Sequence, residues 1–217
     1  MKTKSVVISI IAILFCFSSA PAQIVKGYGI KTGAVISNQH FEYAPEAKVG
    51  TTGDKKNRTG FDFGISLEWF NLPFFSLLTE VHYAQKGMIE EIPKTNEYGQ
   101  EIAPRKYDKR IDYLSLPILA KIALNSKHIT PYLVIGPRFD FNLDLKSDVF
   151  FGWQGNEFKN VDVGGTLGVG VESKSEPLKA ILEFRYSPDF TYAYKSDLLK
   201  IKNRSFEILF GIAIRMP

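Results

Sequence analysis

This sequence of 217 residues contains one cysteine, few long apolar runs and no large excess of charge of one sign. Its one cysteine, Cys16, cannot form an internal disulfide bridge, so the fold must be stable without one. Beyond the amino-terminal segment, no stretch approaches the roughly eighteen consecutive apolar residues of a transmembrane helix. The formal net charge is only +4, which is too small to favour nucleic acid or a strongly anionic partner.

The amino terminus has the three parts of an export signal. Lys2 and Lys4 form a positive region, residues 6–17 are almost entirely apolar, and Ala20-Pro21-Ala22 supplies the small residues that a signal peptidase needs. We predict that residues 1–22 are removed as a signal peptide and that residues 23–217 form one domain. That domain has a net charge of +2 and no cysteine. The alternative for the apolar segment is a buried first helix.

The carboxyl-terminal segment alternates with a period of two residues, which predicts a β-strand with one apolar face. The opposite face carries charges and glycine. An apolar outside and a polar inside are typical of a membrane-spanning barrel, whereas a soluble sandwich turns its apolar face inward. The apolar positions are Phe206, Ile208, Phe210, Ile212, Ile214 and Met216.

Seven further segments alternate in the same way, which gives eight predicted strands in all. They span residues 27–37, 60–70, 75–88, 110–124, 130–145, 161–173, 178–188 and 203–216. Short connections (71–74, 125–129 and 174–177) alternate with long polar ones (38–59, 89–109, 146–160 and 189–202). We therefore predict an all-β fold, an eight-stranded antiparallel up-and-down transmembrane β-barrel with short periplasmic turns and longer outer loops, located in the cell outer membrane. A soluble lipocalin-like barrel would not require all long loops at one end.

Several motifs in these strands resemble the PorT-like outer-membrane β-barrel proteins of Bacteroidetes. They are Ala84-Gln-Lys-Gly87, Tyr113-Leu-Ser-Leu-Pro-Ile-Leu-Ala-Lys121, Pro131-Tyr-Leu-Val-Ile-Gly-Pro137 and Phe184-Arg-Tyr186. The resemblance covers residues 24–217. It implies a non-enzymatic barrel, and the member that names the family is tied to protein secretion.

The inward positions of the predicted strands carry both signs of charge in similar number. An eight-stranded barrel is only wide enough for its own side chains, so these charges must be paired or hydrated. The expected interior charge network, in which Glu80 and Lys121 belong together, comprises Glu68, Glu80, Lys121, Arg138, Glu183, Arg185, Glu207 and Arg215. Such a network would plug the lumen. The alternative is a narrow, gated channel for ions or small solutes.

Catalytic, metal and cofactor sites are not expected. His40, His82 and His128 fall on separate parts of the predicted barrel, so they cannot converge on a metal. His82 could serve a barrel-embedded lipid-modifying enzyme, but no serine partner stands out near it. Gly164-Gly-Thr-Leu-Gly168 lacks the lysine and helix of a phosphate-binding loop.

The expected partners follow from the predicted location. They are outer-membrane lipid, the insertion machinery during biogenesis, and envelope or secretion proteins, with no nucleic acid. Lys55, Lys56 and Arg58 cluster near the base of the first long loop, where they could contact lipopolysaccharide phosphates. The role favoured by the sequence is that of a structural, interaction or secretion-accessory barrel.

Overall fold

The computed structural model describes residues 25–44, 53–70, 72, 74–124, 126–147, 159–175, 177–195, 197 and 199–216. The predicted signal peptide, residues 1–22, lies outside these ranges. No helix in the described part of the chain is long and apolar enough to cross a membrane. The strands are β1 (Val25–Tyr43), β2 (Asp54–Trp69), β3 (Phe75–Thr95), β4 (Glu101–Ala123), β5 (Ile129–Ser147), β6 (Val161–Ser173), β7 (Leu178–Pro188), β8 (Tyr194–Lys195) and β9 (Leu199–Arg215).

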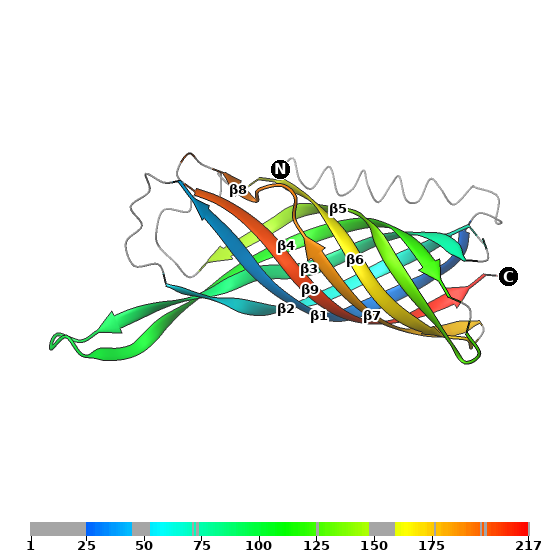
Figure 1. The fold of residues 1–217 in the computed structure, drawn as a ribbon, viewed down its shortest axis with the longest axis horizontal. Helices are drawn as coiled ribbons and strands as arrows, with labels where there is room; N and C mark the ends of the chain where they lie inside the picture. Colours follow the sequence, from blue (N-terminus) through cyan, green and yellow to red (C-terminus); the bar gives the residue numbers. More distant parts are fainter. Residues whose placement is uncertain are drawn as a thin grey trace.

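The long strands form a closed antiparallel ring. Each pairs with the next in the order β1-β2-β3-β4-β5-β6-β7-β9, and β9 pairs back with β1 from Gly27↔Arg215 to Tyr43↔Leu199. Figure 1 shows these strands winding around one long axis. The two-residue strand β8, which the sequence pattern did not predict, only adds to one end of β9. The predicted eight-stranded up-and-down barrel is thus confirmed.

Burial alternates along the strands as the period of two requires. In β6, Asp162, Thr166 and Glu172 are buried, whereas Leu167 and Val169 between them are 53% and 52% exposed. The same holds around the ring. Because the large apolar side chains point out and the polar ones point in, the outer surface suits lipid and the interior is polar. The exposed belt includes Tyr28, Ile30, Phe63, Ile65, Leu133, Ile135, Phe184, Phe206, Phe210 and Ile212.

The two ends of the barrel differ. At one end, which we call the short-turn end, brief connections join β2 to β3, β4 to β5 and β6 to β7. At the other, the long-loop end, all four segments predicted as loops are partly strand: β5 extends to Ser147, and β8 and the first residues of β9 lie within 189–202. The first long loop was predicted over residues 38–59, but β1 extends to Tyr43 and β2 begins at Asp54. In β1 and in β2, backbone pairing with the neighbouring strand continues beyond the residues that alternate between apolar and polar.

The clearest difference from the sequence prediction is the β3–β4 hairpin. Residues 89–109 were predicted as a loop, yet β3 and β4 stay paired from Met88↔Lys109 out to Thr95↔Glu101. Figure 1 shows this hairpin projecting well beyond the barrel. Its tip is a tight turn in which Asn96 Oδ1 accepts backbone hydrogen bonds from Tyr98 and Gln100, with Gly99 at φ 75°. Backbone pairing and turn chemistry therefore extend strands whose side chains are too polar to show an apolar period.

Gly87 lies where this hairpin leaves the barrel wall. Its φ of 140° is accessible to glycine and strained for other residues. A Cβ there would lie only 1.9 Å from the carbonyl oxygen of Lys109. The Ser37 hydroxyl bonds both its backbone groups, accepting from the N–H at 2.9 Å and donating to the C=O at 3.0 Å. The β2–β3 register also shifts beside this point, so Gly87 marks a bend fixed by close packing.

Candidate functional site: the charged lumen

The lumen contains charged side chains that are almost completely buried. They fall into three clusters along the barrel axis, which we name the central, long-loop and short-turn clusters. A small apolar layer of Leu78, Leu119, Tyr132 and Val134 packs among them. Since a buried charge is costly unless it is paired, the pairing within each cluster indicates what the lumen can do.

The central cluster is a balanced group of two cations and two carboxylates from β1, β3 and β7. Lys31 Nζ contacts Glu80 Oε1 at 2.7 Å and Glu183 Oε2 at 2.8 Å. Arg185 donates two hydrogen bonds to Glu80, at 2.6 and 3.0 Å, and also contacts Glu183. All four side chains are at most 4% exposed. This arrangement crosses the lumen and leaves each charge with a partner of opposite sign.

Two neighbours complete the central cluster. Tyr132 donates its hydroxyl hydrogen bond to Glu183 at 2.7 Å. Its ring fits because its register partner is Gly170, where a Cβ would lie 2.4 Å from the ring carbon Cζ. His82 places one ring nitrogen 2.5 Å from Asp62 and the other 3.1 Å from Glu80. The histidine therefore faces carboxylates on both sides, deep inside the barrel.

The long-loop cluster is richer in carboxylates. Lys86 donates to Asp140 at 2.7 Å; Arg138 donates to Asp140 at 2.9 Å and also bonds Asp189. Tyr113 donates its hydroxyl hydrogen bond to Asp162 at 2.9 Å. One oxygen each of Asp140, Asp162 and Asp189 is buried without a hydrogen-bond partner in the protein. Among the described residues, no three histidine, cysteine, aspartate or glutamate side chains come together as a metal site.

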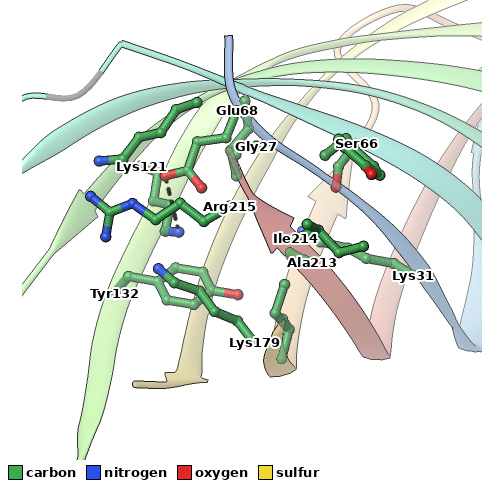
Figure 2. Close-up of a pocket in the computed structure, with 14 residues that line it drawn as sticks. Gly27, Lys31, Ser66, Glu68, Lys121, Tyr132, Lys179, Ala213, Ile214 and Arg215 are labelled. Carbon is green, nitrogen blue, oxygen red and sulfur yellow. Dashed lines mark hydrogen bonds and ion pairs between the residues drawn. The ribbon is translucent and has the colours of Figure 1, made fainter. Parts of the chain in front are cut away.

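The short-turn cluster lies at the mouth of the barrel. Lys121 Nζ contacts Glu172 at 2.6 Å and Glu68 at 3.3 Å. Lys179 Nζ contacts the other oxygen of Glu172 at 2.9 Å. Figure 2 shows Glu68, Lys121, Lys179 and Arg215 gathered close to Tyr132. This cluster borders an open cavity.

The structure places the sequence-predicted charges in different clusters. Glu80, Glu183 and Arg185 meet in the centre, Glu68 and Lys121 at the short-turn mouth beside Arg215. Arg138 lies in the long-loop cluster. Glu207 is buried and accepts a hydrogen bond from Ser205 at 3.1 Å.

One expected pairing is not direct. Glu80 and Lys121 make no ion pair with each other; Glu80 pairs with Lys31 and Arg185, and Lys121 with Glu68 and Glu172. Tyr132 links the two clusters, since its hydroxyl bonds Glu183 and its ring lies 4.8 Å from Lys121 Nζ. The tilt of the strands carries Glu80 deeper into the barrel than its place on β3 suggested.

The predicted network left out several lumen charges. Five of them occupy inward positions on strands, where strict alternation was the available signal, and Asp189 directly follows β7. Lys31 was overlooked because two glycines flank it, at positions 29 and 33, and weaken the polar–apolar contrast. The charges that the predicted network left out are Lys31, Lys86, Asp140, Asp162, Glu172 and Asp189.

The basic residues near the first long loop have neighbours of their own. Lys56 pairs with Glu91 at 2.6 Å and Arg58 with Asp108 at 2.8 Å. Lys55 Nζ lies 3.7 Å from the centre of the Phe41 ring. The expected contact of this cluster with lipopolysaccharide stays a prediction.

Comparison with known proteins agrees with this geometry. The family profile described as "Outer membrane protein beta-barrel domain" matches residues 22–193. The chain belongs to this family. It is therefore an outer-membrane β-barrel protein. No match was found among curated proteins.

Solved structures share the fold at low sequence identity. The outer membrane protein AlkL, studied by solid-state NMR in DMPC bilayers, is similar with a TM-score of 0.50 and 11% identity over 91% of this chain and 93% of that one. OprG from Pseudomonas aeruginosa gives 0.49 and 11% over 89% and 97%. Neisserial surface protein A gives 0.48 and 16% over 87% and 97%. At such identities the similarity concerns the fold alone.

Proposed function

We propose that this protein is a non-enzymatic outer-membrane barrel with a structural or interaction role, and that its lumen is closed. The observation that carries the proposal is the central cluster, in which Lys31, Glu80, Glu183 and Arg185 join opposite walls through paired charges. An ion could pass this layer only if buried ion pairs were broken. Breaking each pair costs roughly several kcal/mol. We therefore favour a lumen plugged by these charges over a narrow channel.

His82 supports the non-enzymatic part of the proposal. In a serine-type triad, the histidine would bond a nucleophile on one side and a carboxylate on the other. Here both ring nitrogens face carboxylates, Asp62 and Glu80. With only 2% of the residue exposed, an outside lipid could not reach it without opening the lumen.

The proposal also covers the orientation of the protein in the membrane and its partners. We propose that the signal peptide is removed, that the short-turn end faces the periplasm as in other bacterial barrels, and that the chain is a PorT-like member acting with envelope or secretion proteins. The projecting β3–β4 hairpin would then be outside the cell. It offers a long surface for contact, with Tyr98 at its tip 87% exposed.

Planar-bilayer conductance tests the closed lumen. We expect no steady current from the purified protein reconstituted at levels where an open pore is readily seen. The variant Glu80→Ser with Arg185→Ser removes a large part of the plug and serves as the positive control, provided that protease protection confirms its insertion. A stable, ion-selective current from the unmodified protein would refute the proposal in favour of the channel.

A further inference from the structure

The outward face of β9 changes from cationic to apolar at one point along the strand. Every second side chain of residues 200–206 is buried, at most 3% exposed. The side chains between them, those of Lys200, Lys202, Arg204 and Phe206, therefore point away from the lumen. Towards the short-turn end, this outward row continues with the apolar residues of the lipid-facing belt. Towards the long-loop end it consists of three cations.

Two aromatic side chains mark the edge of the lipid-facing belt on this face. The ring centroids of Tyr186 and Phe206 are 4.8 Å apart, and Phe206 is 55% exposed. Aromatic residues of membrane barrels gather at the interface between lipid and water. Arg204 follows two residues nearer to the long-loop end, which is about 7 Å along a strand and about 5 Å along the membrane normal at a tilt of about 40°. Arg204 and then Lys202 thus lie at the level of the lipid headgroups.

The cross-strand partners of Lys202 and Arg204 are not acidic. Arg204 lies between Asn38 of β1 and Pro188 of β7, and Lys202 is the register partner of His40. Directly opposed side chains on one face of a sheet are those that interact most closely. An anion that approaches these two cations from the membrane therefore meets no carboxylate at their register positions.

Tyr192 orients the lysines of this row. Its ring centre lies 4.4 Å from Lys202 Nζ and 5.6 Å from Lys200 Nζ, and its hydroxyl donates to Glu42 Oε2 at 3.0 Å. A cation–π contact uses the face of a ring, so the ammonium group of Lys202 can still donate to phosphate oxygens. Glu42 is the register partner of Lys200, which makes Lys200 the least suited of the three cations to bind an anion.

We propose that Lys202 and Arg204 bind a phosphate group of lipopolysaccharide in the outer leaflet, with its acyl chains along the apolar face of β9. Lysine and arginine are the usual partners of phosphate oxygens. The apolar face continues through Phe210 and Ile212, which are 58% and 47% exposed, so one amphiphile can contact both parts of the row. The inference deepens the proposed interaction role and rests on the proposed orientation, which places the long-loop end outside the cell.

Binding of lipid A, the phosphorylated lipid part of lipopolysaccharide, tests this site. The purified protein in uncharged detergent is titrated with diphosphorylated lipid A, with its dephosphorylated form and with inorganic phosphate, and the bound molecules are counted by native mass spectrometry. We expect diphosphorylated lipid A to bind at least tenfold more tightly than either of the others. Equal binding of the dephosphorylated form would overturn the role of the cations. Equal binding of inorganic phosphate would overturn the lipid as the source of the phosphate.

Matched variants locate the binding. Lys202→Gln with Arg204→Gln should weaken lipid A binding roughly tenfold or more, since a hydrogen bond to a charged group contributes about that factor. The charge-preserving pair Lys202→Arg with Arg204→Lys should bind normally. Arg105→Gln with Lys106→Gln removes the same charge from the exposed β3–β4 hairpin and should leave binding unchanged.

The comparison between the two glutamine pairs decides the assignment. If the pair on β9 binds lipid A as well as the pair on the hairpin, the row on β9 is not the site. Binding in detergent depends on neither conductance nor orientation, so failure of this inference is distinguishable from failure of the proposed function.

Discussion

The ion pair between Lys31 and Glu80 gives the most direct measure of what holds the lumen together. Glu80→Gln would leave Lys31 and Arg185 to share one carboxylate, Glu183, so one buried cation loses its counter-charge. Breaking a buried pair in this way costs about 3–5 kcal/mol. Lys31→Met should cost a similar amount, because two carboxylates would then share Arg185. The double variant keeps the pair of Arg185 with Glu183, so its loss should stay near that of one single variant.

The assay is equilibrium unfolding by urea in lipid vesicles, followed by tryptophan fluorescence. Because the double variant should lose no more than one single variant, the expected coupling between the two positions equals one single loss, about 3–5 kcal/mol. The matched control is Lys146→Met with Asp144→Asn, a pair 3.4 Å apart whose side chains are both more than half exposed. That pair should couple by less than about 1 kcal/mol. If the lumen pair couples no more strongly than this control, the account of the central cluster is wrong.

Three further predictions concern the wall, the bend and the orientation. Ile30 is on the lipid-facing belt, so Ile30→Arg should reduce the stability of the inserted barrel by about 2–4 kcal/mol in the same unfolding assay. The control Ile30→Val should change this stability little. If the arginine variant is as stable as the unmodified protein, this face does not contact lipid. Gly87→Ala should cost about 1–3 kcal/mol because of its φ of 140°, and a loss below about 0.5 kcal/mol would show that the bend is not strained. A cysteine replacing Tyr98 should react with an impermeant maleimide on whole cells, and one replacing Ser126 only after the cells are broken; the reverse result would invert the proposed topology.

The sequence predicted the ring well because a membrane barrel imposes a strict rule on each strand. Lipid on one side and packed polar groups on the other force alternation over the whole membrane span, so the pattern in β6 and β9 could be read directly. That constraint ends where the strands leave the membrane. The β3–β4 hairpin is held by backbone pairing and by the Asn96 turn, neither of which needs alternation, so residues 89–109 had the composition of a loop.

The pairing of charges in the lumen was less predictable for a different reason. Alternation identifies which side chains point inward, but their depth depends on strand tilt and shear, which the sequence does not reveal. Glu80 and Lys121 are on adjacent strands, yet their ion-pair partners come from β1, β2, β6 and β7. Lys31 shows the consequence most clearly, since it reaches both Glu80 and Glu183 from a strand next to neither β3 nor β7.

The demand for paired charges also differs with depth in the barrel. At mid-barrel, water cannot reach Lys31, Glu80, Glu183 and Arg185. An unmatched charge there would cost roughly several kcal/mol, and the four charges of this cluster cancel. At the short-turn mouth, Glu68, Lys121, Glu172 and Lys179 line an open cavity that solvent can enter, so the penalty for an imperfectly paired charge is smaller there. For a narrow barrel of this kind, the demand for paired charges should therefore be strictest in the middle of the axis and weaker at its ends.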